Sequence, residues 1–128
     1  MKYARFIEKV AERMGGSLGQ AEAVTQAALL TLAERITGGE ARDLAEQLPT
    51  ELREFLTTTD EPAEAFDLDE FVRRVSIRAG VDSDTASRGV PAVFQTLHRA
   101  VGDGEFQDVL GQLPKEFQNL VPELIRRR

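Results

Sequence analysis

The stretch that decides the fold is Gly38-Gly39-Glu40-Ala41-Arg42-Asp43-Leu44-Ala45-Glu46-Gln47-Leu48-Pro49. Its Gly-Glu, Asp and Gln-Leu-Pro positions recur at the same spacing in residues 103–114. When the whole chain is shifted by 65 residues, residues 6–56 align with residues 71–121 without a gap and with 15 identities in 51 positions. Self-similarity at a fixed period indicates a repeated structural unit. We therefore predict that the chain is a tandem duplication.

Each copy has the pattern of amphipathic helices, with apolar residues three and four positions apart and no convincing strand pattern. The predicted helices cover residues 2–14, 18–36, 40–47 and 50–57 in the first copy and residues 68–79, 83–101, 105–112 and 115–126 in the second. Capping boxes are predicted from Ser17 with Gln20 and from Asp67 with Glu70, because each pair has the spacing that this motif requires.

Glycine and proline set the expected helix ends. Gly15 and Gly80 follow the first helix of each copy, where a residue that tolerates the left-handed conformation commonly ends a helix. We expect sharp stops at Gly38-Gly39 and at Gly102-Asp103-Gly104. Inside the long helix of the second copy, Pro91 removes a backbone donor and crowds the preceding turn, so a kink or break is expected near Gly89–Pro91.

The predicted fold class is all-α. We expect a compact bundle of two tandem copies of a roughly four-helix unit, related by pseudo-twofold symmetry. The chain would form a single helical domain over residues 1–128, with internal repeats at 1–57 and 67–128 and a linker at 58–66. One copy is marginal alone at this size, so the copies should pack face to face and share one core.

A family resemblance carries the same expectations. An aromatic-led first helix, an alanine-rich second helix and the motif of residues 38–49 resemble a bacterial family catalogued as domain of unknown function number 2267. The second copy keeps most of the motif but has Asp103 in the place of Gly38 and Phe106 in the place of Ala41. The resemblance implies an all-helical bacterial protein of unassigned activity, and it brings no catalytic residues with it.

Composition excludes several classes of site. The chain has no cysteine, so disulfides and thiolate metal sites are excluded, and its single histidine, His98, excludes a multi-histidine metal site. No apolar run is long enough to span a membrane, and the N-terminus does not read as a signal peptide, so we expect a cytoplasmic protein. The net charge of −6 argues against a nucleic-acid-binding body. The terminal Arg126-Arg127-Arg128 is interpreted as a solvated tail, with a weak contact to an acidic surface or nucleic acid as the alternative.

The candidate site residues are few, and no catalytic, cofactor-binding or metal-ligating residue is assigned. His98 has no catalytic partner motif, so we expect a surface or half-buried structural role. Arg13 and Arg78 are expected to bind the last carbonyls of their own helices or the repeated acidic residues. The polar residues repeated on one helical face of each copy are Glu40, Asp43, Gln47, Glu105, Asp108 and Gln112. They form either a paired acidic site for a cation or a basic partner, or a structural set of helix-end groups, which we favour.

The sequence therefore favours a non-enzymatic helical interaction or scaffold protein of unassigned cellular role, with no cofactor. The expected partner is another protein or a second copy of the chain. Two alternatives stay open, which are a nucleic-acid-associated regulator and a binder of a small apolar ligand between the repeats. An extra apolar turn at the C-terminus, with Val121, Leu124 and Ile125, is expected to cap the bundle or to form a weak self-association surface.

Overall fold

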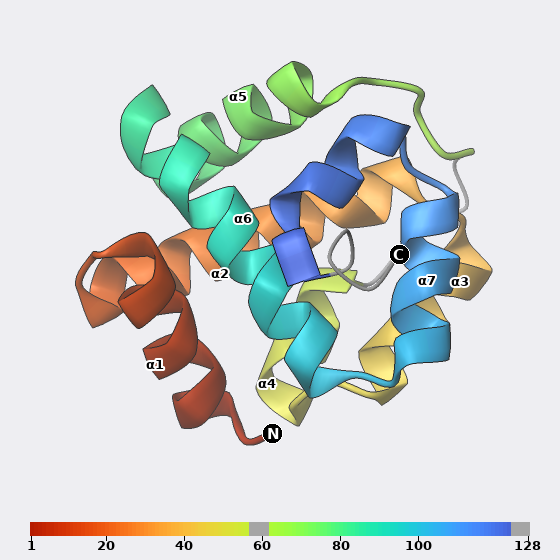
Figure 1. The fold of residues 1–128 in the computed structure, drawn as a ribbon, viewed down its shortest axis with the longest axis horizontal. Coiled ribbons are helices and arrows are strands. Elements are labelled where there is room, and N and C mark those ends of the chain that lie inside the picture. Colours follow the sequence, from red (N-terminus) through yellow and green to blue (C-terminus); the bar gives the residue numbers. More distant parts are fainter. Residues whose placement is uncertain (57–61, 124–128) are drawn as a thin grey trace.

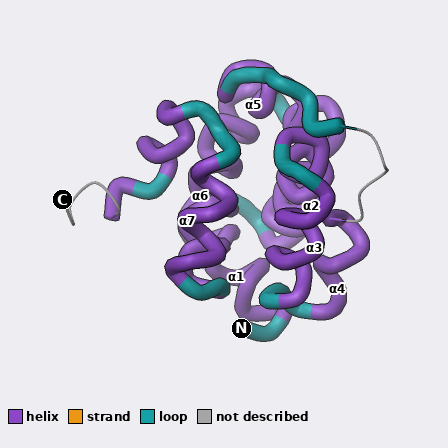
Figure 2. Tube along the Cα trace, turned by 90° about the vertical axis from the view of Figure 1, so that its right-hand side faces the viewer, coloured by secondary structure: helices purple, strands orange, loops and turns teal. Residues whose placement is uncertain are grey.

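The computed structural model describes residues 1–56 and 62–123, and its regular structure over those ranges is entirely helical (Figures 1 and 2). The predicted all-α class is confirmed. In chain order the elements are α1 (Tyr3–Met14), α2 (Leu18–Arg35), α3 (Gly38–Glu46), α4 (Thr50–Arg53), the 3-10 helix η1 (Glu54–Leu56), α5 (Leu68–Ala79), α6 (Ser83–Ala100), α7 (Asp103–Gly111) and the 3-10 helix η2 (Lys115–Leu120). Within the described ranges, no helix is long and apolar enough to cross a membrane.

The elements of the two halves correspond closely. Helices α5, α6 and α7 begin and end 65 residues after α1, α2 and α3. Gly15 and Gly80, with φ of 69° and 68°, end α1 and α5 in the left-handed conformation that glycine adopts readily, as predicted. The tandem duplication and the pseudo-twofold relation stay predictions, for which a superposition of residues 6–56 on 71–121 is the test.

The capping box predicted at the start of α2 is present. The Gln20 amide donates to the Ser17 hydroxyl at 3.1 Å, and the Ser17 amide donates to Gln20 Oε1 at 3.2 Å. At the start of α5 only half of the predicted box forms, because the Glu70 amide donates to Asp67 Oδ1 at 2.9 Å but the Glu70 carboxylate binds arginines instead. A stronger charge-assisted partner therefore outcompetes the backbone amide for that carboxylate.

The long helices α2 and α6 end within one residue of the predicted positions, at Arg35 and Ala100, but the predicted role of glycine in these stops is wrong. Helix α2 ends at Arg35, Ile36 is extended, and the Thr37 hydroxyl accepts from the Glu40 amide and caps α3. Gly38 and its neighbour are thus the first residues of a new helix, which the hydroxyl cap stabilises. Helix α7 begins at the equivalent Asp103 without a side-chain cap. Among the described residues, only the glycines after α1 and α5 have a positive φ.

The break predicted near Gly89–Pro91 does not occur, and α6 is continuous from Ser83 to Ala100. Proline leaves only one carbonyl, that of Ser87, without its usual helical donor. The residues on either side of it, Val90 and Ala92, are buried in the core, so packing keeps both parts of the helix in place.

The fourth helix of each copy is shorter than predicted. Residues 50–57 form α4 followed by η1, and residues 115–126 contain η2, which ends at Leu120. Val121 is buried, as a residue that caps the bundle should be. Leu124, Ile125 and residues 126–128 lie outside the described residues, and so does the part of the linker at 58–61.

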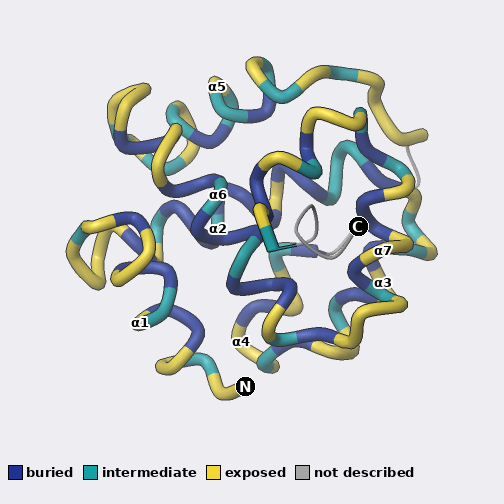
Figure 3. Tube along the Cα trace, in the orientation of Figure 1, coloured by how far each residue is buried: buried dark blue, intermediate teal, exposed yellow. Residues whose placement is uncertain are grey.

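The buried side chains of both halves form one continuous core. Figure 3 marks the buried positions along the chain, which occur in both halves. Helix α1 packs against α6 and α2 packs against α5, so the main helices of one half lie on those of the other. Phe71 makes edge-to-face contacts with Phe94 and Phe117, at centroid distances of 5.7 and 5.5 Å. Phe6 and Phe106 are also fully buried. Each half therefore depends on the other to cover its apolar surface.

Candidate functional site

Helices α3 and α7 lie against each other and bring three of the repeated acidic residues together (Figure 1). Glu40 and Glu105 are the third residues of these helices. One carboxylate oxygen from each of Glu40, Glu105 and Asp108 lies within 4.8 Å of the others. We call these three residues the acidic cluster.

The repeated glutamines hold the two helices together beside this cluster. The Gly102 amide donates to Gln47 Oε1 at 2.9 Å, and the Thr37 amide donates to Gln112 Oε1 at 2.8 Å. Each glutamine thus satisfies a backbone group at the start of the facing helix. The role of both glutamines is structural.

The acidic cluster is partly buried, and the described residues place no paired cation on Glu40 or Glu105. The Oε1 atoms of Glu40 and Glu105 are buried and have no hydrogen-bond partner among the described residues. No lysine or arginine forms an ion pair with either carboxylate within residues 1–56 and 62–123. Burial, followed by the facing Glu40 carboxyl and the charges of Asp43 and Asp108, raises the pKa of Glu105 to about 7.

Carboxylate oxygens are the groups that bind calcium or magnesium, so a cation was one sequence-based interpretation. Calcium takes about six to eight oxygen ligands. The described side chains place three carboxyl groups within reach of one another, and water or backbone carbonyl groups would have to supply the other ligands. The cation interpretation stays a prediction.

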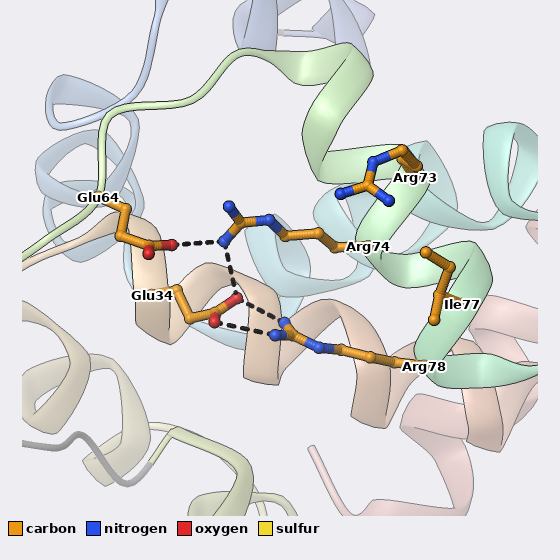
Figure 4. A pocket seen from close by; sticks show the side chains of 6 residues that line it. All are labelled: Glu34, Glu64, Arg73, Arg74, Ile77 and Arg78. Carbon is orange, nitrogen blue, oxygen red and sulfur yellow. Dashed lines mark hydrogen bonds and ion pairs between the residues drawn. The ribbon is translucent and has the colours of Figure 1, made fainter.

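A second feature is a surface pocket of about 360 Å³ between α2, α5 and the segment before α5 (Figure 4). Its lining residues are Glu34, Glu64, Arg73, Arg74, Ile77 and Arg78. We call it the arginine pocket. Sequence analysis missed it, although the spacing of residues 73, 74, 77 and 78 places four side chains on one face of α5.

Ion pairs organise the arginine pocket. Arg78 binds both oxygens of Glu34, at 2.5 and 2.8 Å, and Arg74 donates to the same carboxylate at 3.2 Å. These hydrogen bonds, that from Arg78 above all, lower the pKa of Glu34. Arg74 also binds Glu64 at 2.5 Å and stacks over the ring of Phe66 at 4.0 Å. Arg74 and Arg78 are therefore both neutralised within the chain.

Arg73 and Ile77, the other two lining residues, are more exposed to solvent than Arg74 and Arg78. The Arg73 side chain is 61% exposed and pairs with Glu70, whose pKa falls to about 2 through hydrogen bonds from Arg73 and Arg74. Ile77 is 65% exposed. It lies on the side of α5 opposite Phe71 and Val75, which face the core. The arginine pocket thus presents an apolar side chain beside a solvent-exposed guanidinium.

His98 is more buried than predicted, with 7% of its surface exposed. Its Nε2 atom lies 3.2 Å from Asp103 Oδ1, and its ring lies 4.9 Å from that of Phe106. The start of α7 covers the ring, which the local sequence around residue 98 did not reveal. These contacts give His98 a packing role.

The fold and these sites define a small helical protein with one shared core, the acidic cluster between α3 and α7, and the arginine pocket on α5. The chain belongs to the family described as "Uncharacterized conserved protein (DUF2267)", whose model matches residues 3–120. This match covers both halves and confirms the resemblance inferred from the motif of residues 38–49. A comparison with curated proteins finds no match.

Proposed function

We propose that this protein is a non-enzymatic interaction or scaffold protein of the bacterial cytoplasm, and that it docks a protein partner at the arginine pocket. The observation that carries the proposal is the exposure of Ile77, at 65%, beside three arginines (Figure 4). Arginine is enriched in protein interfaces, and a central apolar side chain ringed by polar groups is the usual arrangement of an interface hot spot.

The charges around the pocket define the partner. Arg74 and Arg78 are held by carboxylates of the chain itself, so they shape the pocket and add little net charge. Arg73 is also paired, with Glu70, but at 61% exposure it is the guanidinium that a partner reaches most easily. The pocket therefore fits a protein segment that covers Ile77 with an apolar side chain and places a carboxylate that competes with Glu70 for Arg73.

The test uses the first half of the chain as a matched control. A photo-crosslinking amino acid replaces Ile77 in one variant and Glu12 in the other, since Glu12 is exposed and holds the equivalent position on α1. Cross-linking in the native cell should join one defined protein at position 77 and none at position 12. With that protein purified, Ile77→Glu should weaken binding about 30-fold or more, as loss of a hot spot does.

Two results would contradict the proposal. Equal cross-linking at positions 12 and 77 would show non-specific contact. Unchanged affinity of the purified partner for Ile77→Glu, in a variant with the wild-type melting temperature, would place the binding surface elsewhere.

A further inference from the structure

Glu40 and Glu105 face each other from equivalent positions of α3 and α7, and their surroundings oppose full ionisation of both. Each has a buried Oε1 atom with no hydrogen-bond partner among the described residues. A carboxylate can only accept hydrogen bonds, so two facing carboxylates cannot satisfy each other. One added proton turns one of them into a donor, and a hydrogen bond between the two becomes possible.

The neighbouring charges favour that proton. Asp43 of α3 and Asp108 of α7 add negative charge near Glu105. The elements packed on α7 supply no compensating cation in the described contacts. On α6, His98 lies against Asp103. On η2, Glu116 accepts from the Leu68 amide, while Lys115 is exposed and forms no ion pair in the described ranges.

Within the part of the chain that the structure describes, the helix termini favour negative charge here. Glu40 and Glu105 lie in first turns, where the backbone amides stabilise a carboxylate. That effect is modest for exposed groups, and burial together with three like charges opposes it. Arg42, the cation of α3, is exposed and makes no ion pair with a described residue. The like charges therefore prevail at Glu105.

We propose that Glu40 and Glu105 share one proton near neutral pH, and that this carboxyl–carboxylate hydrogen bond is a pH-sensitive contact between α3 and α7. On deprotonation the proton passes to water and leaves two facing carboxylates that repel each other. The glutamine bonds to Gly102 and Thr37 lie beside the pair, so repulsion acts on the same helix contact. This inference is independent of the partner proposed for the arginine pocket.

The direction of the pH effect follows from the raised pKa of Glu105, which is about 7 against an ordinary 4.5. The native state binds the proton more tightly than the unfolded chain does. The contribution of the protonated Glu105 to stability is therefore fully present below pH 4.5 and is lost as the pH rises through about 7. Carboxylates in ion pairs, such as Glu70, act in the opposite sense and at lower pH.

The experiment measures the melting temperature of the full chain between pH 5 and pH 8, with a chelator present to remove metal ions. It compares the wild type with two variants, Glu105→Gln and Glu46→Gln. The wild type should lose roughly 5 °C or more over this range. Glu105→Gln should not, because its amide donates to Glu40 at every pH, and it should melt above the wild type at pH 8. Glu46→Gln is the control, since it removes one exposed charge from α3 outside the acidic cluster, and it should follow the wild type.

Two further readouts keep the test decisive if Glu105→Gln fails to fold. The carboxyl carbon resonance of wild-type Glu105 should titrate with a midpoint near 7. In Glu40→Gln, the remaining Glu105 midpoint should fall. Hydrogen exchange at the amides of Thr37 and Gly102 should accelerate above pH 7 beyond its intrinsic pH dependence.

Clear outcomes would overturn the proposal. One is a melting temperature that depends on pH in the same way in the wild type and in Glu105→Gln. The other is a Glu105 carboxyl midpoint near its ordinary value of 4.5. A third measurement repeats the melting experiment with calcium added and no chelator. If calcium stabilises the wild type at pH 8 but not Glu105→Gln, and the carboxyl groups stay ionised at pH 6, the pair holds a cation and not a proton.

Discussion

The Arg13 guanidinium of α1 donates a 2.7 Å hydrogen bond to the hydroxyl of Thr96 on α6, which lies 83 residues further along the chain. Arg78 of α5 makes the equivalent 2.9 Å bond to Thr31 of α2. The expectation that these arginines bind the last carbonyls of their own helices, or the repeated acidic residues, is wrong. Each one instead ties the first helix of one half to the second helix of the other.

This relationship predicts unequal costs for the two arginines. Arg13→Ala should lower the free energy of unfolding by about 0.5–1 kcal/mol, because it removes one hydrogen bond at a largely exposed side chain. Arg78→Ala should cost more, about 1–2 kcal/mol, because Arg78 also binds both oxygens of Glu34. Urea denaturation measures both values. Arg5→Ala, at an exposed position of α1, is the control and should change stability by less than about 0.5 kcal/mol.

A double-mutant cycle with Thr96→Val isolates the bond itself. The coupling between Arg13→Ala and Thr96→Val should be about 0.5–1 kcal/mol, since the residues are in direct contact. Thr96 also donates to the Ala92 carbonyl at 2.8 Å, so Thr96→Val removes this hydrogen bond as well. The cycle cancels that loss, because it occurs with and without Arg13. Additive effects would show that the hydrogen bond contributes nothing measurable.

The aromatic centre of the core gives a larger predicted effect. Phe71 is fully buried and touches Phe94 and Phe117 edge to face. Phe71→Ala should cost about 3–5 kcal/mol, because it leaves a cavity lined by rings that cannot collapse easily. Chemical denaturation gives the value, and Phe71→Leu should cost clearly less because it refills much of the space. A cost below about 1 kcal/mol for Phe71→Ala would contradict a shared aromatic core.

The shared core also predicts the behaviour of one half alone. A fragment of residues 1–60 retains α1 and α2 but loses α6 and α5, against which they pack. It should therefore be unfolded, molten or dimeric, and circular dichroism with light scattering distinguishes these states. A fragment that melts cooperatively as a monomer would show that the halves are independent domains.

Helix positions were largely predictable from the sequence because the apolar period of 3.6 residues is a local signal. The first helices were predicted at 2–14 and 68–79 and are observed at Tyr3–Met14 and Leu68–Ala79. The errors concern places where packing or a cap competes with residue propensity. Burial keeps α6 continuous through Pro91, and the glycines that follow Thr37 begin α3 under its hydroxyl cap.

The sites were predictable only in part, for a related reason. The repeat placed Glu40 and Glu105 at equivalent helix positions, but their contact depends on how α3 meets α7. The arginine pocket depends on the packing of α2 against α5, which brings Glu34 to Arg74 and Arg78. Nothing in the local sequence around residue 34 indicates these partners.

Duplex DNA should not bind this protein tightly. We expect no sub-micromolar affinity near physiological salt, because the chain carries a net charge of −6 and repels phosphates. Arg74 and Arg78 are occupied by carboxylates and release few counterions. A fluorescence titration with labelled duplex measures the affinity at two salt concentrations. Tight binding with a steep salt dependence would support the nucleic-acid-associated alternative.

The N-terminal helix offers a pH-dependent prediction that needs no mutation to observe. Tyr3 is the only tyrosine of the chain, which has no tryptophan, so its ionisation can be followed by ultraviolet absorbance without interference. Burial, together with the 2.5 Å hydrogen bond that its hydroxyl donates to Glu22, raises the pKa of Tyr3 to about 12. Its contribution to stability is present below pH 10 and is lost as the pH rises through about 12.

Removing the carboxylate separates its effect from that of burial. In Glu22→Gln the tyrosine midpoint should fall from about 12 toward 10, since the charge that opposes tyrosinate is gone while burial remains. Glu8→Gln, which removes an exposed charge from α1, should leave the midpoint unchanged. Circular dichroism at each pH confirms that the folded state is being titrated. A wild-type midpoint near 10 in folded protein, or equal midpoints in wild type and Glu22→Gln, would show that the contact between Tyr3 and Glu22 does not persist in solution.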